Sequence, residues 1–141
     1  MNEQVVLGID IGGTNTVYGL VTKDGNVIYH ESIPTNGSIP IADLLYRLDS
    51  KVNEVLSSFP ETEEIIGVGI GAPNGNHFTG MIQDPPNLSW GNVDVITLFS
   101  ETFNCDVKLT NDANAAALGE KHYGIAKEMK DFVVITLGTG L

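Results

Sequence analysis

The most informative part of this 141-residue sequence is VVLGIDIGGTNT, residues 5–16. Apolar residues fill both alternating sets of positions up to Asp10, which predicts a strand buried on both faces. Asp10 then stands where burial of a carboxylate is costly, so we expect a partner such as a hydrated cation or a hydroxyl. Gly12 and Gly13 lack Cβ atoms and let backbone N–H groups approach an anion. An ordinary Asp-Gly turn cap is the alternative interpretation.

Length and composition indicate one globular domain, because 141 residues that are 42% hydrophobic can bury a core. Eighteen Asp and Glu residues face seven Lys and Arg residues, and the formal net charge of −11 argues against nucleic acid or an anionic membrane as a partner. Cys105 is the single cysteine, which favours a reducing, cytoplasmic location. No apolar run approaches ~18 residues, and no basic leader precedes one, so neither membrane insertion nor secretion is expected.

The rest of the chain alternates apolar runs with turn signals. Residues 16–21 and 26–33 predict two strands joined by an Asp-Gly turn, which together with the first run form a three-stranded antiparallel meander. Helical spacing of apolar residues predicts a helix over 41–59, ended by Pro60. The further predicted elements are a buried run at 65–70, a turn at 71–76, a short apolar hairpin segment at 78–82, a rigid loop at 84–90, a helix at 95–102, a strand at 107–109, a helix at 113–123 and a strand at 132–137. This alternation predicts an α/β layer with parallel strands in its later part.

Polar turns follow four of the predicted strands, after Ile9, Ile70, Leu109 and Leu137. Ligands in open α/β sheets gather beyond the carboxyl ends of the strands. We therefore expect the four turns to share one cleft.

Five motifs, taken in their order and spacing, resemble the ROK family of sugar kinases and, within it, bacterial glucokinases. They are DIGGT at 10–14, GIGAP at 69–73, PNL at 86–88, NDANAA at 111–116 and GTG at 138–140. The resemblance implies an actin-like, RNase H-like ATPase fold, with a mixed sheet and helices on both faces. Family members are much longer, so it also implies that residues 1–141 are an N-terminal lobe or fragment, with the C-terminal lobe absent from this chain.

The resemblance places ATP at two glycine-rich turns. The residues that it assigns to the phosphates are Gly12, Gly13, Thr14, Asn15, Gly138, Thr139 and Gly140. It assigns Asp10 to the Mg²⁺ carried by ATP, directly or through water, and hard oxygen ligands do suit Mg²⁺. Asn15 departs from the family pattern, because many relatives have Lys there. For the 138–140 turn, a plain strand-to-strand turn is the alternative.

Asp112 is the candidate general base, because phosphoryl transfer to a sugar needs a carboxylate within ~3 Å of the acceptor hydroxyl. At a helix start, the macrodipole also favours its ionised form. A helix N-cap at Asn111 or Asp112 is the alternative, and both roles are compatible. Asn87 and Asn111 offer a donor and an acceptor to sugar hydroxyls.

The turn at Gly75 and Asn76 is assigned to the sugar side by the resemblance, although Asn76 also suits a plain turn. Trp90 is expected to close its loop onto the core rather than to stack on a sugar. The alanine run at 115–117 is expected to be a close packing face between helix and sheet.

The implied reaction is ATP-dependent phosphorylation of a hexose, foremost glucose to glucose 6-phosphate, a step of carbohydrate metabolism and glycolysis. The alternatives are a ROK kinase for mannose, N-acetylglucosamine, fructose or allose, a non-catalytic sugar-binding regulator of the same fold, and another actin-like ATPase. A structural zinc is expected only in the missing lobe. A homo-oligomer, dimer or tetramer, is expected for the whole protein, and residues 1–141 alone are expected to be inactive.

Overall fold

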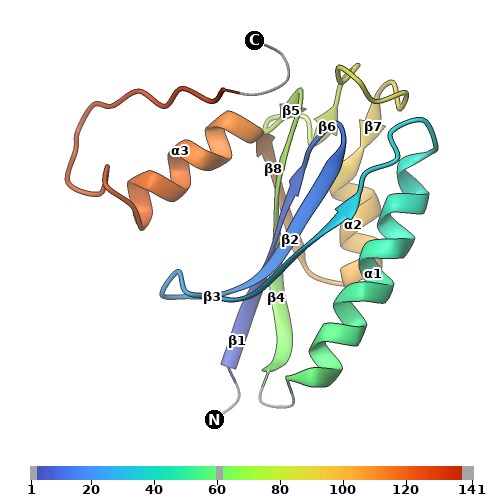
Figure 1. The fold of residues 1–141 in the computed structure, drawn as a ribbon, viewed down its shortest axis with the longest axis horizontal. Coiled ribbons are helices and arrows are strands. Elements are labelled where there is room, and N and C mark those ends of the chain that lie inside the picture. The colour runs from blue at the N-terminus through green and yellow to red at the C-terminus, as the bar shows by residue number, and fades with distance from the viewer. Residues whose placement is uncertain (1–2, 60–61, 138–141) are drawn as a thin grey trace.

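A five-stranded sheet with helices on both faces forms the body of the molecule (Figure 1). The structure is a computed structural model and describes residues 3–59 and 62–137. The sheet has the strand order β3-β2-β1-β4-β8. Its strands are β1 (Glu3–Ile11), β2 (Asn15–Thr22), β3 (Val27–Pro34), β4 (Thr62–Ala72) and β8 (Asp106–Asn111). The helices are α1 (Ile41–Ser58), α2 (Val95–Phe103) and α3 (Asp112–His122), and a small sheet holds β5 (Gly75–Asn76), β6 (Met81–Ile82) and β7 (Val93–Asp94).

The strand directions confirm the predicted meander and the later parallel strands. β1, β2 and β3 pair antiparallel in sequence, whereas β4 pairs parallel to β1 and β8 parallel to β4. The Asp-Gly turn joins β2 to β3, where Gly25 has a φ of +85°, a conformation open to glycine but strained for most residues. Parallel strands need crossover connections, and α1 and α2 supply them.

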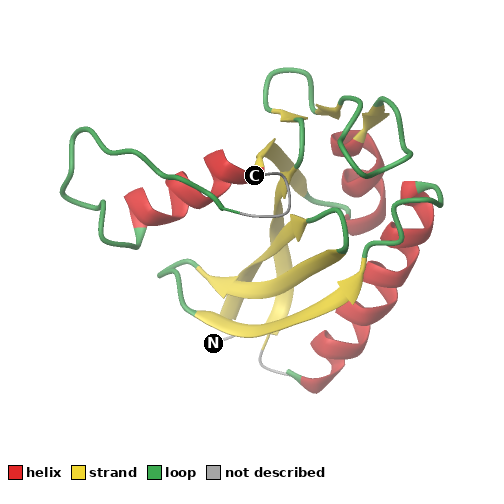
Figure 2. Ribbon diagram, turned by 45° about the horizontal axis from the view of Figure 1, so that its top comes forward, coloured by secondary structure: helices red, strands yellow, loops and turns green. Residues whose placement is uncertain are grey.

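One face of the sheet is fully packed, because α1 and α2 both lie on it (Figure 2). α1 has the predicted amphipathic spacing, and its apolar stripe is buried against the strands. The strands contribute every second residue to this core. In β1 these residues are Val5, Leu7, Ile9 and Ile11.

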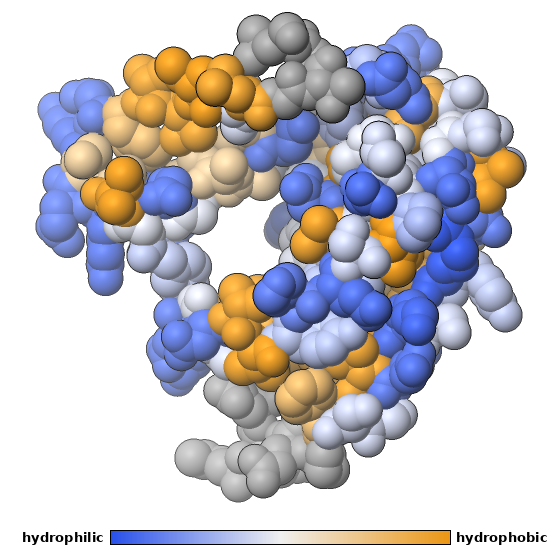
Figure 3. Space-filling view, viewed as in Figure 1, coloured by the Kyte–Doolittle hydropathy of each residue, from blue (hydrophilic) through white to orange (hydrophobic). Residues whose placement is uncertain are grey.

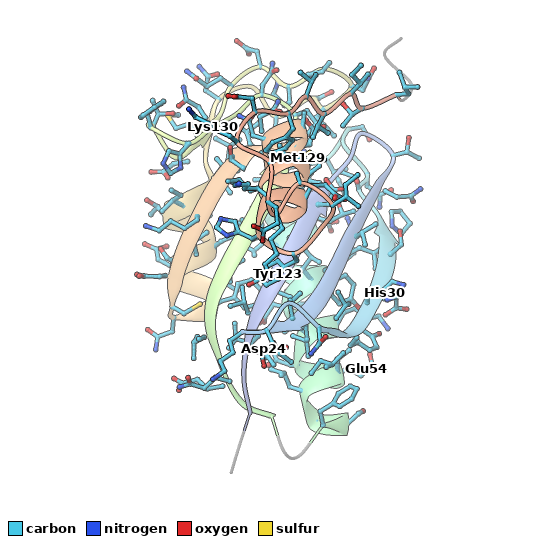
Figure 4. All side chains as sticks on the ribbon, turned by 90° about the vertical axis from the view of Figure 1, so that its left-hand side faces the viewer. Asp24, His30, Glu54, Tyr123, Met129 and Lys130 are labelled. Carbon is cyan, nitrogen blue, oxygen red and sulfur yellow. The ribbon has the colours of Figure 1, made fainter. Side chains whose placement is uncertain are left out.

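The opposite face lies beneath α3 and is open. A groove of about 750 Å³ runs there, lined by residues such as Val6, Gly8, Gly69 and Leu118. α3 buries none of its residues. At its far end Tyr123 points toward the β2–β3 turn that carries Asp24 (Figure 4), and its hydroxyl donates to the Lys23 carbonyl at 3.2 Å.

Apolar side chains remain exposed over α3 and the segment after it, where Figure 3 shows them gathered beside a hollow in the molecule. They include Leu118, Ile125, Val133, Ile135 and Leu137. This side of the molecule therefore lacks the covering layer that α1 and α2 give to the other side.

Three sequence-based expectations are wrong. β1 is fully buried on one face only, and Asp10 is exposed, because the even-numbered side of this strand faces the open groove beneath α3. The alanine run is only partly a packing face, since Ala116 is exposed. Residues 132–137 form no strand among the described residues, because an isolated extended segment there has no neighbouring strand with which to share hydrogen bonds. Pro60 lies outside the described residues.

No helix within residues 3–59 and 62–137 combines the length and apolar character needed to span a bilayer.

Candidate functional site

The carboxyl ends of three parallel strands meet at one edge of the sheet. Asp10 of β1 is in register with Gly71 of β4, and Gly71 is in register with Thr110 of β8. Three of the four predicted turns therefore lie side by side. The fourth turn, residues 138–140, lies outside the described residues, so the expected roles of Gly138, Thr139 and Gly140 stay predictions.

Asp10 and Asp112 flank Gly71. A Cβ added to Gly71 would lie 3.9 Å from Asp10 Oδ1, 3.5 Å from Asp112 Cα and 3.1 Å from Ala115 Cβ. The absence of a side chain at position 71 thus lets α3 begin close to β1. The sequence shows both aspartates, but only the fold brings them together across this glycine.

Asn111 is the N-cap of α3, which confirms the capping alternative for this residue. Its Oδ1 accepts from Ala113 N at 2.9 Å and from Asn114 N at 3.3 Å. Its Nδ2 group makes no hydrogen bond within the described residues. Asp112 follows as the first helical residue, and its carboxylate is exposed at the positive end of the helix dipole.

The environment of Asp10 includes the charge of Asp112. Partial removal from water raises the pKa of Asp10 above its usual range, and the negative charge of Asp112 raises it further. A cation between them would relieve this repulsion. Among the described residues no group of three or more His, Cys, Asp and Glu side chains gathers around a common point. Two carboxylates still fit Mg²⁺ that arrives on a nucleotide, because such Mg²⁺ keeps waters and takes phosphate oxygens as its other ligands.

The glycine turn after β1 has the tight geometry expected of a backbone anion site. Gly12 N donates to Asn15 O at 2.9 Å, and a Cβ on Gly12 would lie only 2.7 Å from that oxygen. Gly13, Thr14 and Asn15 are exposed. The Gly13 N–H makes no hydrogen bond with any described residue, so it is available to an anion.

Asn87 lies against this turn. Its Cβ is 3.4 Å from the position that a Cβ on Gly13 would take, and its backbone has a φ of +63°. The structure therefore brings a predicted sugar residue beside a predicted phosphate residue.

The proline-rich loop is held as a rigid unit, as predicted. Ser89 N donates to Gly37 O at 2.7 Å, and Trp90 Nε1 donates to Ile39 O at 2.8 Å. Leu88 is buried against Gly37. Trp90 thus closes its loop, as expected, and the two loops together position Asn87.

The contacts of Gly75 and Asn76 are with residues of their own turn and of β8, as expected of turn residues. A Cβ on Gly75 would lie 2.6 Å from Thr110 O, so only glycine fits beside the end of β8. Asn76 Oδ1 accepts from Phe78 N at 2.9 Å and from Thr79 N at 3.3 Å, while its Nδ2 donates to Gln83 Oε1 at 3.2 Å.

Sequence reasoning missed Gly71 and Thr35. In the sequence, Gly71 is one glycine of a turn, and no neighbouring residue indicates that α3 packs closely against it. Thr35 is fully buried behind the glycine turn, 23 residues away from Gly12, to whose carbonyl it donates. No short-range pattern links these two positions.

Comparison with known proteins identifies the family of this chain. The model of the ROK family matches residues 6–141. A glucokinase of Halalkalibacterium halodurans is 31% identical over 100% of this chain and 43% of its own length. A xylose repressor of Caldicellulosiruptor bescii is 32% identical over 96% of this chain and 35% of its own length.

Among solved structures, an inorganic polyphosphate/ATP-glucomannokinase from Arthrobacter sp. strain KM superposes with a TM-score of 0.73 at 31% identity, over 90% of this chain and 51% of that chain. The chain spans less than half the length of the curated relatives named above. The match of the family model over nearly all residues, and the shared sheet, show that this chain belongs to the ROK family and has the actin-like ATPase fold of its sugar kinases.

Proposed function

We propose that the whole protein, meaning the natural polypeptide that contains this chain, phosphorylates a hexose with ATP, foremost glucose to glucose 6-phosphate in the cytoplasm. One observation carries the proposal: Asp10 and Asp112 flank Gly71 beside the Gly12–Asn15 turn. Relatives that include a glucokinase and an ATP-using glucomannokinase support the choice of substrates.

Each residue has a separate task in this proposal. Asp112, exposed at the start of α3, takes the proton of the acceptor hydroxyl. Asn87 and Asn111 orient the sugar, and Asn111 does so through its Nδ2 group because its oxygen caps α3. Gly75 and Asn76 shape the turn on the sugar side.

The turn of Gly12, Gly13, Thr14 and Asn15 holds the phosphate oxygens. The Gly12 N–H closes the turn on Asn15 O, and the Gly13 N–H and the side chains of Thr14 and Asn15 serve as donors to the phosphates. Asp10 would hold the Mg²⁺ that the nucleotide carries, because a carboxylate oxygen is a ligand that this cation prefers. When bound, MgATP supplies the γ-phosphoryl group. The raised pKa of Asp10 is consistent with a carboxylate that gains from a nearby cation.

We further propose that residues 1–141 form the N-terminal lobe, and that the rest of the whole protein covers the open groove and completes the nucleotide site. The uncovered face of the sheet and the shorter span relative to its relatives support this division. A structural zinc would belong to that other part. The chain by itself should then show no measurable kinase activity.

A coupled assay of the whole protein with MgATP across a hexose panel tests the proposal. Asp112→Asn should lower kcat by about 10²–10⁴-fold, because it removes the proton acceptor while leaving the fold intact. Asp106→Asn, an exposed acid at the opposite end of β8, is the matched control and should leave kcat within twofold, roughly the scatter of surface changes. Normal kcat in Asp112→Asn would remove this residue from the mechanism.

A sugar-binding regulator is the second candidate, because a xylose repressor is as similar to this chain as the glucokinase is. Calorimetry separates the two. Glucose binding without turnover by the wild-type protein would favour the regulator, and the absence of hexose binding would favour another ATPase of this fold.

A further inference from the structure

The glycine turn is held from behind by Thr35, a residue to which neither composition nor motif assigns a role. Thr35 follows β3 and is fully buried. Its N–H donates to Thr14 O at 2.8 Å, and its hydroxyl donates to Gly12 O at 2.7 Å. Both acceptors are carbonyls of the glycine turn, so Thr35 is hydrogen-bonded to the turn at two points.

The hydroxyl of Thr35 is itself fixed. Thr16 Oγ1 lies 2.9 Å from Thr35 Oγ1, and Thr16 is fully buried as well. Since the single hydrogen of the Thr35 hydroxyl goes to Gly12 O, Thr16 must be the donor in this pair. The hydroxyl therefore has one available orientation.

Arg47 of α1 holds Thr35 from the other side. Its Nη1 donates to Pro34 O at 2.6 Å and its Nη2 donates to Thr35 O at 3.2 Å, while its Nε donates to Asp43 Oδ2 at 2.7 Å. The turn is thus connected through Thr35 to the helix that packs on the core face.

The consequence for the site follows from peptide geometry. In a trans peptide the C=O and the next N–H point in opposite directions, and the described residues contain no cis peptide bond. Drawing the Gly12 carbonyl toward Thr35 therefore turns the Gly13 N–H away from Thr35, to the exposed side of the turn. That N–H is the donor that makes no hydrogen bond within the described part of the chain.

We propose that Thr35 is a positioning residue, which orients the Gly13 N–H toward a phosphate of the nucleotide by holding the Gly12 and Thr14 carbonyls. This inference rests on the proposed phosphate-binding role of the turn. Thr35 touches no substrate, and it acts only through the backbone of the turn.

Kinetics of the whole protein test the proposal. Thr35→Val keeps the shape and removes the hydroxyl, so KM for MgATP should rise about tenfold while KM for the hexose stays within twofold. Thr35→Ser keeps the hydroxyl, so its KM for MgATP should stay within about twofold of wild type. The control is Thr22→Val, which removes a different buried hydroxyl, at the end of β2 far from the glycine turn, and should leave both KM values unchanged.

Amide hydrogen exchange on the same preparations gives a readout that needs no kinase activity. In Thr35→Val, exchange at the Gly12 and Thr35 amides should quicken about tenfold, with Leu7 in the middle of β1 unchanged. If the wild type phosphorylates no hexose, the proposed function fails, and this measurement still decides whether Thr35 holds the turn.

Two results would overturn the positioning role: an active wild type with unchanged KM for MgATP in Thr35→Val, or unchanged exchange at both amides. Should Thr35→Val not fold, Thr16→Val removes only the donor that fixes the Thr35 hydroxyl. A rise of about threefold in KM for MgATP would then support the role, and no rise would refute it.

Discussion

The two faces of the central sheet differ although the same strands build both. On the face under α1 and α2, Val5, Leu7, Ile9 and Ile11 of β1 are buried to 3% exposure or less. On the face under α3, a groove of about 750 Å³ remains and the helix buries no residue. The core of this chain is therefore one-sided, and the face that carries Asp10 is the one left open.

Several glycines also line the open face, and they differ in how much space surrounds them. A Cβ at Gly69 would meet nothing within 4 Å, whereas one at Gly19 would lie 2.6 Å from Tyr29 O. Space is thus available over β4 for a closely packed element, whereas the backbone of β3 fills the corresponding space beside β2. This contrast separates glycines that the chain itself requires from those that it does not.

The largest expected difference in stability is between two leucines, one on a helix of each face of the sheet. Leu48 of α1 is fully buried, and Leu48→Ala should lower the free energy of unfolding by about 2–5 kcal/mol through lost burial and a cavity. Leu118 of α3 is 53% exposed, and Leu118→Ala should change it by less than about 0.5 kcal/mol. Urea unfolding of the 141-residue chain measures both. Equal losses would show that the two faces are packed alike.

An intermediate effect on the free energy of unfolding is expected at Gly69, and it should differ between the 141-residue chain and the whole protein. Gly69→Ala should change the free energy of unfolding of the chain by less than about 0.5 kcal/mol, but should cost about 1–3 kcal/mol in the whole protein, where a covering element would be overpacked. Gly19→Ala is the control. Its new methyl group would clash with the Tyr29 carbonyl of β3, so it should destabilise both the 141-residue chain and the whole protein. A neutral Gly69→Ala in the whole protein would contradict a cover over β4.

The smallest effect concerns the acid on the open face. Because the folded-state pKa of Asp10 is raised above 3.8, the folded chain binds this proton more tightly than the unfolded chain does. Its contribution to stability is therefore present at low pH and is lost as the pH rises from about 3.8 through the raised pKa. Asp10→Asn should gain stability relative to wild type over this window, by less than about 0.5 kcal/mol because the side chain is exposed.

Carbon-detected NMR titration checks the cause directly. In Asp112→Asn the pKa of Asp10 should move down toward its usual value, since the repulsion from Asp112 is gone. Part of the rise should remain, because partial removal from water is the larger cause. A pKa of Asp10 that does not respond to Asp112→Asn would mean that the two carboxylates do not interact.

Most elements were predictable because their signals are local. The helix at α1 follows from apolar spacing, the β2–β3 turn from Asp-Gly, and the rigid loop at 84–90 from its prolines. The strand predicted at 132–137 failed for a non-local reason: its apolar residues suit a strand, but strand formation needs a neighbour that the described residues do not provide.

The sequence by itself determined the order of the five main-sheet strands and the three helices, the glycine turn and both aspartates, because turn residues and apolar periodicity act over a few positions. Only the tertiary structure decided that Asp10 and Asp112 flank Gly71. It also decided that Thr35 hydrogen-bonds to the carbonyl of Gly12, from which it is separated by 23 positions in the sequence. It also decided that Asp10 lies on an open face, since burial depends on which elements pack over a strand and not on the strand's own residues.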